Sequence, residues 1–237
     1  MRKLLSFCRW IALRGIAAVV AVNVAFSLLV AYPGFALAHH HDAGQIQIYS
    51  TKDIPESAGP WAANLIAEMA STPLPLDHGT YNFYITNGGW TEKLYFLPTR
   101  VAGGLVYPMN RRAVFLSGAD FSADRLIKGD NTMTPPRTLT YYGVHELTHL
   151  THMAAIGRLN YLLQPTWVRE GLADYAALGP ADPATIAAVT SWTGRRLPLM
   201  QTYGSYPEFR VQFTQALATR SLQDLLTLSR LDTKDET

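Results

Sequence analysis

The stretch VHELTHLTHM, residues 144–153, places three histidines and one glutamate within ten positions. On an α-helix each residue advances about 100°, so His145 and His149 lie about 40° apart and their imidazoles converge from one face. Glu146 lies about 100° from His145, beside a metal that the two histidines would hold. This His-Glu-x-x-His spacing is typical of a catalytic zinc site in which the glutamate handles the metal-bound water.

The third histidine of the stretch, His152, is not expected to be a ligand. It lies on the same helical face but seven residues beyond His145, which is roughly 10 Å along the helix axis. Because zinc–nitrogen bonds are about 2 Å long, these histidines on one straight helix cannot all reach one ion. A histidine six positions after His149 is excluded as well, since that position is Ala155. We therefore expect His152 to serve in packing or on the substrate side of the site.

A second expected helix, TWVREGLADY after Pro165, supplies the missing ligand. It contains Glu170 and Asp174, and residues four apart share one face of a helix. Glu170 can complete the coordination, because a catalytic zinc usually takes three protein ligands and a water. Asp174 can accept the free ring N–H of a ligating histidine, which fixes the tautomer of that histidine. Gly171, beside the ligand, would let the two helices approach closely.

A solvated polar face is the alternative for these two acids, but the two motifs together resemble those of a known family. The chain is similar to the gluzincins, thermolysin-like zinc peptidases in which His-Glu-x-x-His is followed by a glutamate on the next helix. It resembles in particular the minimal peptidase MA-like domain, whose second motif is Trp-x-x-Glu-Gly-x-Ala-Asp/Glu-Tyr. The matching positions here are Trp167, Glu170, Gly171, Ala173, Asp174 and Tyr175. The resemblance covers residues 135–230 well and the strand region before them only loosely.

The resemblance implies a role for each matched position. His145, His149 and Glu170 would bind one zinc ion, and Asp174 would orient His145. Glu146 would be the general base toward the water on the zinc and then the proton donor to the leaving amine.

The resemblance also implies a substrate groove and an oxyanion donor. An extended peptide would lie along an edge strand of the sheet, for which RAVFLSG (112–118) is the candidate. Related enzymes use a later tyrosine or histidine to stabilise the tetrahedral oxyanion. No histidine follows His152, so the candidates are Tyr203, which the family spacing to Phe209 favours, and Tyr206. Either tyrosine can equally be a core aromatic.

The first 38 residues differ in character from the rest of the chain. They carry four basic residues and no acidic one, and residues 15–38 carry no charge at all. The small-x-small triplet ALA at 36–38 precedes polar sequence, as at the cleavage site of a secretory signal peptide, and Tyr32-Pro33-Gly34 interrupts the helix before it. The competing interpretation is a retained membrane anchor, since the apolar run is near the length of a membrane span. In both cases the remaining domain is expected to be exported, either to the periplasm or as a secreted protein.

Charge and cysteine content narrow the classes of function. Without the first 38 residues, 16 basic and 18 acidic residues remain, which is a net charge of −2. The excess of basic residues that is typical of nucleic-acid-binding proteins is therefore absent. The only cysteine, Cys8, lies in the leader, so a metal site in the remaining domain must use nitrogen and oxygen ligands. HHHD at 39–42 is expected to be a flexible exposed tail, with metal capture at a new N-terminus as the alternative.

Residues 39–237 are expected to form one α+β domain of the zincin-like kind, with a strand-rich part at 45–118 and a helical part at 135–231. A small mixed or antiparallel sheet would come first, and the two motif helices would come after it. The pattern predicts strands at 45–50, 80–86, 103–108 and 112–118, the last two paired as a hairpin, and helices at 56–72, 137–157, 166–178, from 183 onward and within 207–231.

These observations predict an exported zinc metallopeptidase that acts on a peptide or protein substrate. A contact with the membrane is expected only if the N-terminal segment is retained. Two alternatives remain open at this point. One is a zinc-dependent amidase or other hydrolase acting on a cell-wall or other non-peptide substrate, since a fold does not specify its substrate. The other is a zinc-binding domain without turnover, against which the intact Glu146 argues.

Overall fold

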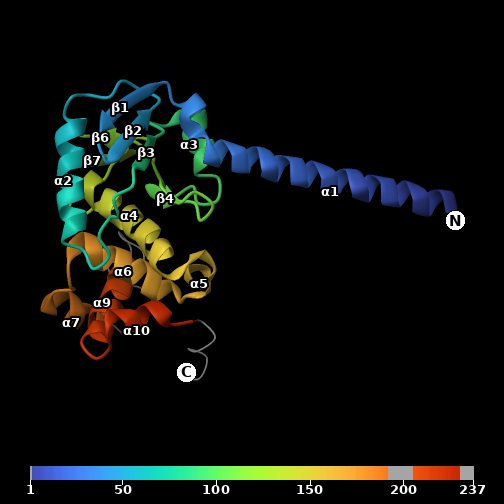
Figure 1. Ribbon diagram of the computed structural model, residues 1–237. Coiled ribbons are helices and arrows are strands. Elements are labelled where there is room, and N and C mark those ends of the chain that lie inside the picture. The colour runs from blue at the N-terminus through green and yellow to red at the C-terminus, as the bar shows by residue number, and fades with distance from the viewer. Residues whose placement is uncertain (1, 192–204, 230–237) are drawn as a thin grey trace.

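The computed structural model describes residues 2–191 and 205–229 (Figure 1). A long N-terminal helix comes first, the strands follow it, and helices fill the second half of the chain. The fold is mixed α+β with a small mixed sheet, so the expected fold class is confirmed at that level.

The main sheet has five strands in the order β1-β2-β3-β5-β4. The central pairs β2–β3 and β3–β5 are parallel, whereas β1 and β4 run antiparallel to their neighbours. The strands are β1 (His39–Ala43), β2 (Ile46–Ser50), β3 (Tyr81–Ile85), β4 (Gly104–Val106) and β5 (Ala113–Leu116). The four predicted strands and the predicted hairpin are confirmed.

Two expectations about this sheet are wrong. The HHHD stretch is not a tail: it belongs to β1, which pairs with β2 over its full length, and the ring of His40 stacks on Tyr49 at 4.6 Å. RAVFLSG is not an edge strand, because β5 lies between β3 and β4 and all four of its residues are buried. The outer strand on that side of the sheet is β4.

The two faces of the sheet build separate clusters, because successive side chains of a strand point to opposite faces. The inner face carries the aliphatic and aromatic side chains that pack against α2 (Ala58–Ala70) and α4 (Leu139–Ile156), namely Ile46, Ile48, Phe83, Ile85, Val114 and Leu116. The outer face carries Tyr49, Tyr84, Ala113 and Phe115, which pack with α3 (Gly89–Tyr95) and the segment after it.

The helix α4 positions the first motif and is buried on most of its surface. Its first turn is fixed by Thr138, whose side chain accepts a hydrogen bond from the backbone N–H of Tyr141. Asp124 adds a second cap by accepting from the N–H and the hydroxyl of Thr140 at 2.7 and 2.8 Å. The helix ends at Gly157, whose positive φ of 82° suits glycine.

The second half of the chain forms a helical layer below the sheet in Figure 1. It consists of α5 (Arg158–Leu163), α6 (Thr166–Leu178), α7 (Pro183–Thr190), α9 (Tyr206–Leu217) and α10 (Leu222–Thr227). The predicted helices are present, and α5 lies between the two motif helices, where no helix was predicted. A Cβ on Gly171 would lie 2.5 Å from the carbonyl oxygen of Phe209, so this glycine lets α6 approach α9. The expectation that it lets the two motif helices approach each other is wrong.

Three short strands and one helix complete the fold. The strands β6 (Ala119–Asp120), β7 (Arg125–Lys128) and β8 (Asn131–Thr132) form an antiparallel ribbon ahead of α4. The strand-containing part therefore spans residues 39–132, which is wider than the expected 45–118. The helix α1 (Arg2–Ala31) leaves the body of the molecule, and its Arg14–Ala31 stretch is long and apolar enough to cross a membrane by length and composition.

Candidate metal centre

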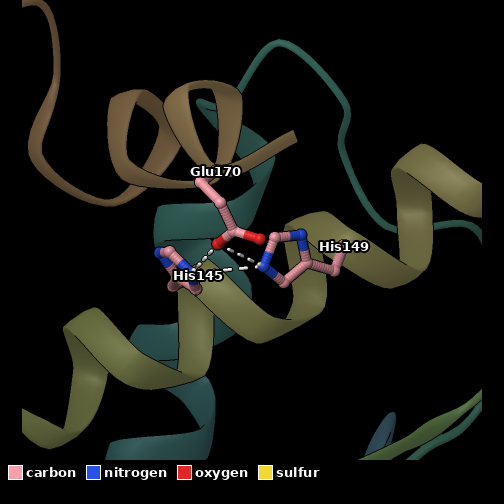
Figure 2. A group of neighbouring side chains, drawn as sticks. All are labelled: His145, His149 and Glu170. Carbon is pink, nitrogen blue, oxygen red and sulfur yellow. Dashed lines mark hydrogen bonds and ion pairs between the residues drawn. The ribbon is translucent and has the colours of Figure 1, made fainter. Parts of the chain in front are cut away.

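The helices α4 and α6 bring His145, His149 and Glu170 to one point (Figure 2). The Nε2 atoms of the two histidines are 3.2 Å apart, and Oε2 of Glu170 lies 3.4 Å from each of them. The two histidines are buried, whereas the side chain of Glu170 is 21% exposed. Three ligand atoms from two helices thus form a nearly equilateral triangle.

This triangle has the size that a zinc ion requires. With zinc–ligand bonds of 2.0–2.1 Å, two corners of a tetrahedron lie about 3.3 Å apart. The three observed separations agree with that value. Two imidazoles and one carboxylate are also a donor set that zinc accepts, and a fourth corner would stay open for water or substrate. The residues therefore fit a zinc ion.

A polar partner lies near the other ring nitrogen of each histidine. Oδ1 of Asp174 lies 3.5 Å from Nδ1 of His145, and the hydroxyl of Tyr141 donates a hydrogen bond to the same carboxylate. The hydroxyl of Tyr161 lies 2.9 Å from Nδ1 of His149. These contacts leave both Nε2 atoms to face the metal position, as partners around a metal site commonly do.

The surroundings of His145 favour a positive charge. Burial alone would lower the pKa of its imidazole, but the carboxylates of Asp174 and Glu170 raise the pKa to about 10. Burial likewise works against the ionised form of Glu170, yet the two histidines hold the pKa of this carboxyl well below its usual value. The carboxylates that favour a proton on His145 would also attract a metal cation to the same position.

The carboxyl group of Glu146 is buried beside the triangle and faces β4. Burial raises its pKa above the usual value, although His149 and His145 oppose the shift. A Cβ on Gly104 would lie 2.7 Å from Oε1 of Glu146, and one on Gly103 would clash with Leu126. Gly104 therefore gives Glu146 room at the start of β4, and Gly103, just before the strand, gives room to Leu126 of β7.

A cavity of about 150 Å³ joins Glu146 and His145 to β4. Gly104 and Val101 line it on the strand side, and Tyr206 lines it on the helical side. The ring of Tyr206 packs edge-on to His145 at 5.5 Å. Burial raises the pKa of the Tyr206 hydroxyl, so it stays protonated and can donate a hydrogen bond. Tyr203, the preferred oxyanion donor, lies outside the described residues.

The arginine Arg137 also lines this cavity. Its guanidinium lies 4.7 Å from the ring centroid of Tyr206 and 5.5 Å from that of Tyr141. It therefore places one positive charge at the edge of a site that contains three carboxylates.

The structure separates His152 from the metal position. Its side chain is fully buried, packs edge-on against the ring of Tyr161 at 5.2 Å, and has no hydrogen-bond partner at either ring nitrogen among the described residues. Burial lowers the pKa of its imidazole to about 3. His152 is a neutral packing residue, one of the two roles expected for it.

Three residues of the site were missed by sequence reasoning. Tyr141 lies four positions before His145 on the same helical face, so its contact with Asp174 could have been found from helical spacing. Tyr161 comes from α5, where no helix was predicted, and Arg137 lies just before the motif helix. Neither carries a sequence pattern that indicates its contacts.

Comparison with known proteins adds nothing to this picture. No family model matches the sequence, and a search of curated proteins finds no match. The function must therefore be inferred from the geometry of the site.

Proposed function

We propose that this protein is a zinc-dependent metallopeptidase of the gluzincin type, with a zincin-like fold. The observation that carries the proposal is the triangle of His145, His149 and Glu170, because its edges of 3.2–3.4 Å fit a tetrahedral zinc ion. A buried carboxylate beside the triangle supplies the second requirement of hydrolysis, which is a base.

A zinc ion held there would supply Lewis-acid chemistry, lowering the pKa of water and polarising a carbonyl. Glu146 would take a proton from the attacking water and deliver it to the leaving nitrogen, so that the peptide bond is replaced by a carboxylate and an amine. The raised pKa of Glu146 supports this role, since a general base accepts a proton more readily when its pKa lies closer to the operating pH.

The strand β4 would bind the substrate. Among the described residues it pairs only with β5, so its other edge can accept an extended peptide as an added strand. The backbone of Gly104, at the start of β4, lies close to the carboxylate of Glu146. A peptide bound along β4 would therefore pass beside the base. This proposal replaces RAVFLSG with its hairpin partner as the substrate strand.

Tyr206 is the candidate oxyanion donor among the described residues. It lines the same cavity as Glu146, and its hydroxyl is kept protonated by burial. A protonated phenol directed at the developing oxyanion would stabilise the transition state. Asp174 would hold His145 in the tautomer that presents Nε2 to the metal.

Replacing Glu146 with glutamine tests the proposal. The variant keeps the shape of the side chain and removes the base, so peptide hydrolysis should fall by about 10²–10⁴-fold. Metal content, measured on the same sample, should stay unchanged. Glu68→Gln, at an exposed glutamate on α2, is the matched control and should keep full activity. Activity of Glu146→Gln at the level of the unmodified chain would contradict the mechanism.

A further inference from the structure

We propose that α1 is retained as a membrane anchor and that the side of the domain around its root rests on a lipid bilayer. This side, the membrane-facing surface, is formed by α3, the parts of the segment 96–110 that lie outside β4, and α5. The proposal goes beyond the peptidase activity and does not depend on it.

The end of α1 is built into the domain. Val30 is fully buried and Leu37 is 3% exposed, both in the cluster on the outer face of the sheet that contains Phe115 and Tyr107. The side-chain amide of Asn110 donates a hydrogen bond to the carbonyl oxygen of Val30 at 3.1 Å. Cleavage after residue 38 would remove this cover and expose the aromatic side chains beneath it.

The interruption at residues 32–34 supports the same conclusion. In the sequence alone it favours cleavage, because it resembles the end of a removable leader. In the structure, Pro33 is buried and begins the 3-10 helix η1 (Pro33–Ala36), which carries the chain from α1 onto the outer face of the sheet. The break therefore joins α1 to the domain instead of separating the two.

The apolar part of α1, whose end packs on the domain, has the properties of a membrane span. Its 18-residue stretch Arg14–Ala31 has a mean hydropathy of 2.0 and is 6% buried, and it would extend about 27 Å at 1.5 Å per residue. That length is close to the roughly 30 Å of a bilayer core. The four basic residues of this region precede its uncharged part, which orients the N-terminus to the cytoplasm and the domain to the outside.

The segments that pack with the end of α1 carry exposed apolar side chains. Trp90, Leu97, Val101 and Met109 are between 50% and 88% exposed and come from α3 and the segment 96–110. Scattered exposed apolar residues are normal on a soluble protein, but a group beside a membrane span indicates contact with lipid. Trp90 and the 64% exposed Tyr32 are also the aromatic types that collect at the headgroup level.

The surface continues to α5 through contacts between neighbouring segments. Arg158, at the start of α5, donates a hydrogen bond to the carbonyl oxygen of Met109 at 3.2 Å. The adjacent Asn110 holds Val30 of α1, so α1, the segment 96–110 and α5 are joined. Leu159 and Leu162 of α5 are 70% and 47% exposed. In Figure 1, α1 leaves the molecule on the side where α3 and α5 lie, opposite α2 and α7.

The first experiment follows the N-terminus of the full chain expressed in a bacterial host with a C-terminal tag. We expect the protein in the membrane fraction after an alkaline wash, with intact mass and N-terminal peptides that include residues 2–38. A soluble protein that begins at His39 would overturn the proposal.

The second experiment tests whether the end of α1 belongs to the core. Leu37→Ala should lower the melting temperature of the detergent-solubilised chain by roughly 5–15 °C, because it empties a buried position. Leu28→Ala is the matched control, since Leu28 is 53% exposed on α1, and it should change the melting temperature by about 1 °C or less. Equal effects of the two variants would contradict the packing of this segment on the domain.

The third experiment locates the bilayer. The chain with Cys8→Ser is reconstituted into vesicles of phosphatidylethanolamine and phosphatidylglycerol that contain a lipid-bound quencher, and a fluorophore is attached through Leu162→Cys. We expect strong quenching there and little quenching for Glu68→Cys, an exposed position on α2. Equal quenching at the two positions would overturn the membrane-facing surface. Self-crosslinking of Leu162→Cys without quenching would overturn it as well, and would assign that surface to a second copy of the chain.

Discussion

The two faces of the five-stranded sheet are covered in different ways. The inner face packs against α2 and α4 and supports the metal centre, so the centre rests on a core that the domain builds from its own helices. The outer face packs against α3, the segment after it and the last turns of α1. One face is therefore complete within the domain, whereas the other depends on a segment that resembles a removable leader.

The largest expected effects on stability come from truncating a buried phenylalanine on either face of the sheet. Phe83 and Phe115 are both fully buried, on the inner and outer faces respectively. Phe83→Ala and Phe115→Ala should each lower the free energy of unfolding by about 3–5 kcal/mol, which denaturant titration measures. Only Phe115→Ala should also speed protease cleavage at residues 32–38 under native conditions. Equal cleavage rates in the two variants would show that the outer face does not hold this segment.

The next largest expected effect is on zinc affinity, at the metal centre that the inner face supports. Asp174→Asn keeps the size of the side chain but weakens its hold on Nδ1 of His145, so zinc affinity should fall by about 10–100-fold in a competition titration with a chelator. Asp182→Asn is the matched control, because Asp182 caps α7 and asparagine caps a helix equally well. Unchanged affinity in Asp174→Asn would remove Asp174 from the metal centre.

The smallest expected effect on stability comes from an ion pair between the segments that precede β3 and β5. Arg112 binds both carboxylate oxygens of Asp77 at 2.7 Å, and this guanidinium holds the pKa of Asp77 well below its usual value. Because the folded-state pKa is lowered, the stabilisation is present above about pH 4, the pKa in the unfolded chain, and is lost as the pH falls below it. Both side chains are more than a third exposed, so the contribution is at most about 1 kcal/mol.

Thermal unfolding over a range of pH checks this ion pair. Asp77→Asn should lower the melting temperature at pH 7, and the difference from the unmodified chain should shrink as the pH falls below 4. Asp130→Asn, at an exposed turn, should have no effect at either pH. A difference that stays constant with pH would show that the charge of Asp77 does not matter.

Much of the fold could be predicted because its strands and helices carry local patterns. Tyr81, Phe83 and Ile85 alternate with residues that face the other way, and the motif helix is bounded by Thr138 and Gly157. The position of β5 inside the sheet could not be predicted, since a run of four buried residues does not specify its neighbours. β1 was missed because three consecutive histidines resemble a tail, although pairing with β2 satisfies their backbone groups.

The candidate site could be predicted where spacing along one helix decides the geometry. The 40° between His145 and His149 follows from helical rotation, and the exclusion of His152 follows from the rise along the axis. The contact of Tyr161 with His149 and the approach of Gly104 to Glu146 could not be predicted, because both depend on how separate segments pack. The role of Tyr203 stays a prediction.

Metal analysis of three purified chains tests the central claim most directly. The unmodified protein and His152→Ala should each contain one zinc ion per chain, whereas Glu170→Ala should contain much less, with circular dichroism showing that every chain is folded. This result would show that the third ligand comes from α6 and not from the motif stretch. Full zinc content in folded Glu170→Ala, with loss of zinc in His152→Ala, would contradict the account.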